Sequence, residues 1–326
     1  QRLQSHRMEI IFLILGIAIL IKGADWLVEG SSALAKKYGV SSLIIGLTIV
    51  AFGTSAPELI VSLISVLGGN TGTAFGNVIG SNIANLLLVL GAAALVGTPR
   101  IKTSTVWKEI PFSLLAVIAL LVVSNDLIID GIRISSLTRV DGIVLLLFFA
   151  VFVYYIIEAA NRSRAEIGES LKIVRISNRR IYTLIIVGSL GLFIGGKWVV
   201  DGAVYIAGSL GVSDFLIGAT VIALGTSLPE LVTSVRAVMK NDLDLVVGNI
   251  VGSNIFNIFW ILGLMSLIAP VDIPVNINFD IIFLALSTFL LFIFMFVGEK
   301  HKLEKRQAII FLIMYILYLV IIIMRG

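Results

Sequence analysis

The chain contains no cysteine, only two histidines and only six prolines among its 326 residues. The absence of cysteine excludes disulfide bonds, thiolate catalysis, zinc fingers and iron–sulfur centres. Charged residues make up 13% of the sequence, against about 25% in an average soluble domain. Long apolar runs between the few prolines also exclude a disordered, collagen-like or coiled-coil chain.

Apolar residues dominate the composition of the chain. They account for 58% of the chain, and the mean hydropathy is +1.08, which is too high for a water-soluble fold. We therefore expect a polytopic membrane protein embedded in the lipid bilayer. Its net charge of +4 is typical of basic loops on the cytoplasmic side of a membrane, so we expect no nucleic-acid partner.

A helix needs about 20 mostly apolar residues to cross the bilayer core, and the sequence divides into ten such stretches. These long runs lack the alternation of a transmembrane barrel and predict an all-α bundle. The predicted spans are 9–35, 42–67, 73–96, 106–124, 141–158, 181–209, 215–239, 243–268, 278–297 and 307–324.

Met8 would serve as a natural start, so residues 1–7 are expected to be a cloning remnant or a disordered N-terminus. No cleaved signal peptide is expected after it. We divide the rest into a first half at 8–160, a basic cytoplasmic loop at 161–180 and a second half at 181–326, all within one membrane domain.

Lysine and arginine are unevenly distributed between the two sides that ten spans would create. One side carries five, namely Arg2, Arg7, Arg133, Arg139 and Arg325. The other carries 16, namely Lys36, Lys37, Arg100, Lys102, Lys108, Arg162, Arg164, Lys172, Arg175, Arg179, Arg180, Lys240, Lys300, Lys302, Lys305 and Arg306. The side rich in positive charge is expected to be cytoplasmic. This predicts a multi-pass protein of the cell membrane with both termini extracellular.

The sequence contains an internal repeat. Residues 46–63 match residues 218–235 at 10 of 18 positions, and residues 76–91 match residues 248–263 at 9 of 16, both at an offset of 172. Two gapless matches in one register indicate two homologous halves of five spans each. Since five is odd, the second half must be inverted relative to the first. Inverted repeats are a common build of secondary transporters, with the site at the repeat interface.

Each half carries Gly-Thr-Ser-x-Pro-Glu in the middle of its second span, ending at Glu58 and Glu230. Proline removes a backbone donor and clashes with the preceding turn, so Pro57 and Pro229 predict broken helices at the centre of the protein. Carbonyl groups freed by the break, hydroxyl groups and a carboxylate would then lie together. Such an oxygen-rich group suits a hard cation, for example Na⁺ or Ca²⁺.

The third span of each half carries Gly-Asn-x-x-Gly-Ser-Asn-Ile-x-Asn. On a helix, Asn77, Ser81 and Asn85 lie along one face, and Asn249, Ser253 and Asn257 do the same. The glycines Gly76, Gly80, Gly248 and Gly252 have the spacing that permits close helix contact.

Structural interpretations compete with these functional ones. Ser55 with Glu58, and Ser227 with Glu230, match a capping box that would only satisfy backbone donors. The asparagine and serine rows could serve only as hydrogen bonds between helices. Snorkelling or internal ion pairs explain Lys22, Glu29, Lys197 and Asp201 better than ligand binding does.

These paired motifs, GTSAPE with GNVIGSNIAN and GTSLPE with GNIVGSNIFN, resemble the two α-repeats of the cation/Ca²⁺ antiporter superfamily, most closely its prokaryotic Na⁺/Ca²⁺ exchangers. The resemblance covers the whole chain and implies alternating access around a central site, with Ca²⁺ and Na⁺ as transported ions. We expect no cofactor and a functional monomer. It implies these metal ligands: Glu58, Glu230, Thr54, Ser55, Thr226, Ser227, Ser81, Ser253, Asn85, Asn257, Ala51 and Ala223.

Some members of the superfamily carry aspartate at the position of Asn257. With asparagine there, the formal charge of the implied site is −2, which balances one Ca²⁺ and weakens a case for K⁺ co-transport. The loop at 161–180 is too short for the regulatory Ca²⁺-binding domains of animal exchangers.

Other functions remain open from the residues alone. Proton/Ca²⁺ exchange is the main alternative, since Glu58 and Glu230 could bind protons if desolvated. A cation channel is less favoured, because no tetrameric filter loop is present. An intramembrane hydrolase with an acid pair is disfavoured because hydroxyls and amides accompany the carboxylates, so we expect a transporter and not an enzyme.

Overall fold

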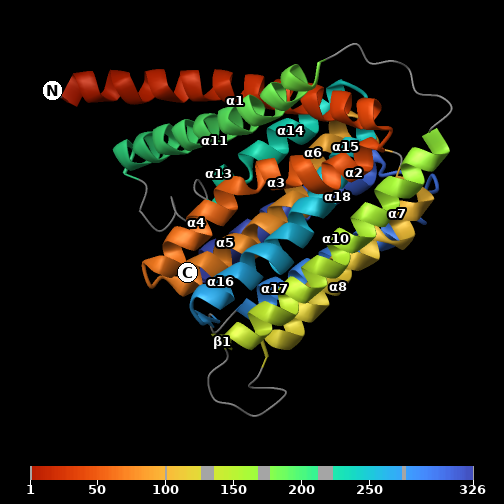
Figure 1. Cartoon of the computed structure of the whole chain (residues 1–326). Coiled ribbons are helices and arrows are strands. Elements are labelled where there is room, and N and C mark those ends of the chain that lie inside the picture. Colours follow the sequence, from red (N-terminus) through yellow and green to blue (C-terminus); the bar gives the residue numbers. More distant parts are fainter. Residues whose placement is uncertain are drawn as a thin grey trace.

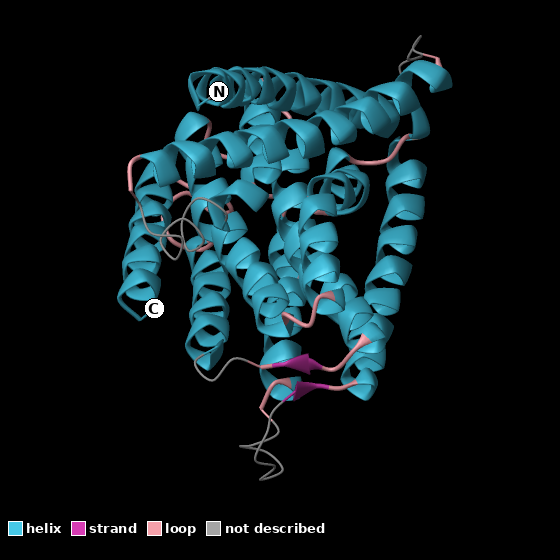
Figure 2. Cartoon of the chain, turned by 90° about the vertical axis from the view of Figure 1, so that its left-hand side faces the viewer, coloured by secondary structure: helices cyan, strands magenta, loops and turns pink. Residues whose placement is uncertain are grey.

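A computed structural model of the chain describes residues 2–99, 101–125, 136–167, 177–211, 223–273 and 277–325, with the side chains of these residues from Met8 onward except that of Ala223. Helices dominate the described chain (Figure 1, Figure 2). The one departure from the expected all-α architecture in these residues is an antiparallel pair of short strands, β1 (Ser136–Leu137) and β2 (Val271–Asp272).

Two long antiparallel helices, α1 (Arg2–Tyr38) and α11 (Asn178–Ser209), lie side by side across one flank of the bundle (Figure 1, Figure 2). Glycine permits their close approach. A Cβ atom at Gly23 would lie 2.7 Å from the main-chain nitrogen of Leu192, and one at Gly188 would lie 2.6 Å from that of Leu27. Small residues at a helix interface let two backbones approach in this way.

The second predicted span is a broken helix. Its parts are α2 (Ser42–Ile45), the π-helical segment η1 (Gly46–Val50), α3 (Ala51–Thr54) and α4 (Ala56–Leu67). The chain leaves helical geometry at Ser55, where φ is −84° and ψ is 5°, and the two parts are bent by 45°. Pro57 lies in the first turn of α4, where its missing N–H costs no intrahelical bond. The predicted break at the proline is therefore confirmed.

The second half repeats this break. Ser227, with φ of −86° and ψ of 3°, separates α13 (Ala223–Thr226) from α14 (Leu228–Met239). The bounds of α14 equal those of α4 shifted by the offset of 172 found in the sequence. The predicted span at 215–239 lies partly outside the described residues, which resume at Ala223.

The third and eighth predicted spans form the most buried part of the bundle. They consist of α5 (Thr71–Ile83), η2 (Ala84–Val89) and α6 (Leu90–Val96), and of α15 (Leu243–Ile255), η4 (Phe256–Leu262) and α16 (Gly263–Ile268). In their most apolar stretches, 78% and 89% of the residues are buried. Each contains a π-helical segment, and η2 and η4 begin at positions related by the offset of 172.

Close glycine contacts join α15 to the first half. A Cβ atom at Gly248 would lie 2.3 Å from the Leu43 carbonyl oxygen, and one at Gly252 would lie 2.8 Å from Leu47 Cα. This confirms the packing role predicted for these two glycines. No described atom lies within 4 Å of a Cβ atom built at Gly76 or Gly80.

The remaining helices flank this centre: α7 (Thr103–Trp107), α8 (Glu109–Val123), α10 (Arg139–Ile167), α17 (Ile277–Phe294) and α18 (Lys305–Arg325). Helix α8 packs on α17, α10 on α16 and α18 on α6. Large apolar side chains, such as Leu147, Leu286 and Ile316, are exposed on their outer faces, as contact with lipid requires.

Eight helices of the described chain are long and apolar enough to cross a membrane, and the broken helix from Ser42 to Leu67 would be a ninth. This makes the chain a polytopic helical membrane protein. The full set of ten spans stays a prediction, because the described residues do not include the first part of the 215–239 stretch.

Both ends of the stretch predicted as a basic loop at 161–180 are helical in the described residues. Helix α10 continues to Ile167 and α11 begins at Asn178. Helical side-chain pairing explains the extension, since Arg162 forms an ion pair with Glu158 one turn earlier on α10. Of the predicted loop, Lys172 and Arg175 lie outside the described residues.

One end of the bundle gathers many of the basic residues that the sequence assigned to one side. Lys102 pairs with Asp244 at 2.6 Å, and Arg164 Nε donates to the Tyr38 carbonyl oxygen at 3.1 Å. The Ile101 amide donates to the His301 carbonyl oxygen in the same region. The strand pair β1–β2 lies at the opposite end (Figure 2).

Candidate cation site

The two helix breaks place a glutamate of each half in the protein interior. Glu58 lies in the first turn of α4 and Glu230 in the first turn of α14, and neither side chain is exposed. The N-terminus of a helix stabilises a negative charge, so both positions can hold a carboxylate.

Contacts across the two halves assemble the residues around these breaks. Ser55 Oγ donates a hydrogen bond to Glu230 Oε1 at 3.2 Å. The hydroxyl groups of Thr54 and Ser253 lie 3.5 Å apart, and those of Ser81 and Thr226 lie 3.4 Å apart. The last two pairs are related by the offset of 172, so each broken helix faces the Gly-Ser-Asn motif of the other half.

Several buried oxygen atoms at this centre have no hydrogen-bond partner among the described residues. Both carboxylate oxygens of Glu58 and one of Glu230 are in this state, and so are the Ser227 hydroxyl and the amide oxygens of Asn85 and Asn257. Buried polar atoms are normally paired, and no described ion pair involves either glutamate. A positive ion is the species that such a set of acceptors would stabilise.

The donor set is chemically suited to a hard cation. The described residues contain no group of three or more histidine, cysteine, aspartate or glutamate side chains placed to hold a metal ion together. Two carboxylates supplemented by hydroxyl and amide oxygens match instead the ligands preferred by Ca²⁺.

The capping-box interpretation is wrong for both halves. Neither Ser55 nor Ser227 makes a side-chain hydrogen bond to the helix that follows it. The Ser55 hydroxyl is instead turned to Glu230 of the other half, and the Glu58 carboxylate has no hydrogen-bond partner among the described residues. The two serines therefore do not cap the helices that follow them.

Two main-chain carbonyl groups at the helix breaks, those of Ala51 and Ala223, were predicted as ligands. The Ala51 carbonyl, predicted to be freed by Pro57, accepts the Ser55 amide at 2.9 Å and the Thr54 hydroxyl at 3.3 Å. The break therefore does not leave it without partners, since a carbonyl can accept two bonds. Ala223, its counterpart, is the first residue of α13.

The first asparagine of each Gly-Asn motif, Asn77 or Asn249, forms hydrogen bonds to a broken helix. Asn77 Nδ2 donates to Ser62 Oγ at 3.0 Å, and Asn249 Nδ2 donates to Ser234 Oγ at 3.2 Å. Asn249 also accepts the Thr54 hydroxyl at 3.0 Å. These contacts tie the facing helices to the broken ones.

Sequence reasoning missed Asn82 and Asn254. Both are buried and make hydrogen bonds to the predicted ligands Asn257 and Asn85 of the opposite half. The signal was available, because Asn82 and Asn85 are three residues apart and share a helix face, and the same spacing occurs at Asn254 and Asn257.

The fold defines a polytopic helical membrane protein, and its two helix breaks meet at a buried, oxygen-rich centre. The sequence matches the family described as sodium/calcium exchanger protein over residues 8–158 and 181–324. The chain belongs to this family.

Two individual relatives and a solved structure are similar to this chain over nearly their whole length. The chain is 36% identical over 306 residues to the uncharacterized membrane protein MJ0091 of Methanocaldococcus jannaschii, covering 94% of this chain and 95% of that protein. It is 35% identical over 320 residues to the putative antiporter CaxA of Alkalimonas amylolytica, covering 94% and 96%. A structure of the sodium-calcium exchanger NCX_Mj, soaked with Na⁺ and Ca²⁺, superposes with a TM-score of 0.82 at 32% identity over 96% of this chain and 98% of that one.

Proposed function

We propose that the chain is an antiporter that exchanges Na⁺ for Ca²⁺ by alternating access, at a site between two inverted five-helix halves. The observation that carries the proposal is the buried pair Glu58 and Glu230, together with the unpartnered oxygen atoms around them. A charge of −2 without a described basic partner requires compensation in a low-dielectric interior. One Ca²⁺ or two Na⁺ would provide it.

The ligands in this proposal are the residues that the motifs indicated. Glu58 and Glu230 supply charge. The hydroxyl or amide oxygens of the other side chains complete the coordination together with the carbonyls of Ala51 and Ala223. The Ala51 carbonyl would exchange one of its two hydrogen bonds for the ion. The side-chain oxygens are those of Thr54, Ser55, Thr226, Ser227, Ser81, Ser253, Asn85 and Asn257.

Competition between the ions follows from this shared site. Either ion load neutralises the carboxylates and lets the inward-open and outward-open forms interconvert, whereas the empty site keeps two uncompensated charges and resists the change. If more than two Na⁺ exchange for one Ca²⁺, each cycle moves net charge. Transport would then respond to voltage at about 2.3 kcal/mol per charge per 100 mV.

The end that gathers Lys102, Arg164 and their neighbours is proposed to face the cytoplasm, in accordance with the distribution of basic residues. Both termini would then be extracellular, in the cell membrane. We propose that one chain is the functional unit, since the site draws its residues from the two halves of a single chain.

The test is Ca²⁺ uptake into proteoliposomes at clamped voltage under an outward Na⁺ gradient, an outward proton gradient, or no gradient. Uptake that requires the Na⁺ gradient supports the proposal. Uptake driven only by protons would replace it with proton/Ca²⁺ exchange, in which Glu58 and Glu230 carry the protons. Equal uptake in all three conditions would indicate a channel.

A further inference from the structure

Four asparagines form a closed hydrogen-bond network between the two halves. Asn82 lies near the end of α5 and Asn85 in η2, while Asn254 and Asn257 occupy the corresponding positions of α15 and η4. All four are at most 2% exposed. Asn82 and Asn254, and Asn85 and Asn257, are each 172 residues apart. Every hydrogen bond of the network therefore has a counterpart in the other half.

Main-chain carbonyls fix the orientation of the first two asparagines. Asn254 Nδ2 donates to the Asn82 carbonyl oxygen at 3.3 Å, and Asn82 Nδ2 donates to the Asn254 carbonyl oxygen at 3.4 Å. A main-chain carbonyl only accepts hydrogen bonds. The amide group of each side chain must therefore turn its nitrogen toward the opposite helix, which leaves its oxygen pointing elsewhere.

These oxygens then orient the other two asparagines. Asn254 Oδ1 accepts from Asn85 Nδ2 at 3.2 Å, and Asn82 Oδ1 accepts from Asn257 Nδ2 at 3.0 Å. Because an amide oxygen cannot donate, Asn85 and Asn257 must present their nitrogens to the network. Their own oxygens are thereby turned away from it, buried and without a described partner.

We propose that Asn82 and Asn254 are positioning residues that hold the amide oxygens of Asn85 and Asn257 available to the transported cation. This inference rests on the proposed function, in which those two oxygens are ligands. Neither positioning residue contacts the ion in this account. Each acts on the ligand of the opposite half, so Asn82 acts through Asn257, and Asn254 acts through Asn85.

The proposal predicts a specific loss of ion affinity. In Asn82→Leu, the side chain keeps its approximate volume but offers no acceptor, so Asn257 can rotate and present its nitrogen to the ion. Loss of one oriented ligand should raise the Ca²⁺ dissociation constant about tenfold. The dissociation constant is measured on the purified protein in detergent from Ca²⁺-dependent thermal stabilisation, which also works for variants that no longer transport.

A remote asparagine pair provides the matched control. Asn125, which follows the end of α8, and Asn278 of α17 exchange reciprocal hydrogen bonds of 3.1 Å and 2.6 Å. Asn125→Leu should lower the melting temperature without Ca²⁺ but leave the Ca²⁺ dissociation constant within about twofold, because neither residue of this pair orients a proposed ligand.

A double-mutant cycle separates positioning from general disruption. In the Asn257→Leu background, Asn82→Leu should have no further effect on Ca²⁺ affinity, whereas in the Asn85→Leu background its full effect should remain. If Asn82→Leu only destabilises the fold and leaves the wild-type dissociation constant, or if its effect adds fully to that of Asn257→Leu, the proposal is overturned. Absence of Ca²⁺-dependent stabilisation in the unmodified protein would instead refute the cation site itself.

Discussion

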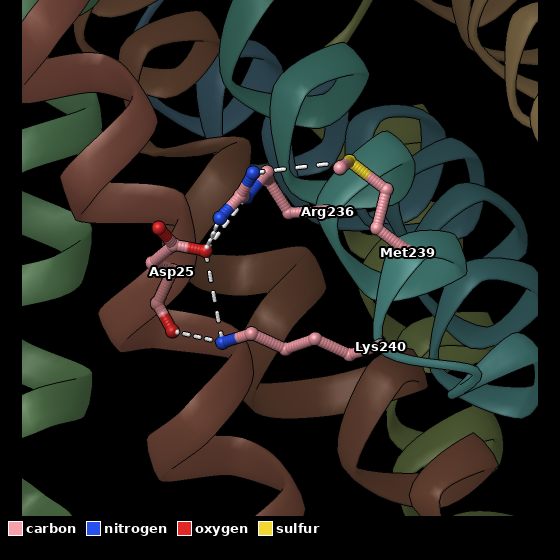
Figure 3. Close-up of polar contacts among 4 residues, drawn as sticks. All are labelled: Asp25, Arg236, Met239 and Lys240. Atoms are coloured by element: carbon pink, nitrogen blue, oxygen red, sulfur yellow. Dashed lines mark hydrogen bonds and ion pairs between the residues drawn. The ribbon is translucent and has the colours of Figure 1, made fainter.

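Arg236 of α14 binds Asp25 of α1 through two nitrogens, with Nε and Nη2 lying 2.6 Å and 2.5 Å from Asp25 Oδ1 (Figure 3). Lys240 adds a hydrogen bond of 2.8 Å to the Asp25 carbonyl oxygen. The offset of 172 relates Asp25 to Lys197 and Arg236 to Ile64. Lys197 pairs instead with Asp201 of its own helix at 2.6 Å, so this link between helices is particular to one half.

The first prediction concerns this link. Arg236→Met should lower the free energy of unfolding by about 2 kcal/mol, because it leaves a largely buried carboxylate with Lys240, at 3.7 Å, as its remaining ion-pair partner. Thermal unfolding in detergent measures the loss.

Lys197→Met is the control for Arg236→Met. Its ion pair with Asp201 is exposed and lies within one helix, so the change should cost less than about 0.5 kcal/mol. Equal losses in the two variants would show that the Asp25 link contributes nothing beyond a surface ion pair.

The second prediction tests the glycine contact between α1 and α11. In Gly188→Ala, the added Cβ atom would meet the Leu27 nitrogen at 2.6 Å, and the two backbones must separate, at a cost of about 1–3 kcal/mol. Gly208 of the same helix is exposed and has no described atom within 4 Å of an added Cβ atom. Gly208→Ala should therefore be neutral or stabilising by up to about 1 kcal/mol. Melting temperatures that fall equally would contradict the tight interface.

The third prediction concerns the bond from Ser55 to Glu230. Ser55→Ala removes the hydrogen-bond donor of Glu230 Oε1 and one proposed ligand oxygen. The Ca²⁺ concentration for half-maximal uptake should rise about fivefold to tenfold. Ser266 is an equally buried serine whose hydroxyl bonds to the Leu262 carbonyl of its own helix stretch. Uptake by Ser266→Ala should match the wild type, and an unchanged Ser55→Ala would remove Ser55 from the site.

Much of the fold was predictable because the bilayer imposes a simple rule on helix length. The predicted spans 42–67 and 243–268 have the same limits as the structure. The repeat predicted the symmetry of the breaks, and proline chemistry predicted their position. The ends of α10 were missed because hydropathy does not register a polar helix that extends beyond the membrane, as α10 does up to Ile167.

The site was predictable in composition but not in its contacts. The motifs indicated the carboxylates and hydroxyls, and the structure brings Ser55 to Glu230 and Ser81 to Thr226. The spacing of Asn82 and Asn85 showed that they share a helix face, but their hydrogen-bond partners could not be predicted, because the bonds cross between halves that are far apart in the sequence. No periodicity within one span reports which helix lies opposite.

The central claim is that Glu58 and Glu230 together hold the transported ions. Its most direct test is Na⁺-dependent Ca²⁺ uptake into proteoliposomes by Glu58→Gln and Glu230→Gln. The control is Glu109→Gln, since Glu109 is also buried but accepts a hydrogen bond from Tyr155, away from the helix breaks. The account predicts loss of uptake in both site variants, because either change halves the negative charge that must balance Ca²⁺, and retained uptake in Glu109→Gln. Wild-type uptake by either site variant would contradict it.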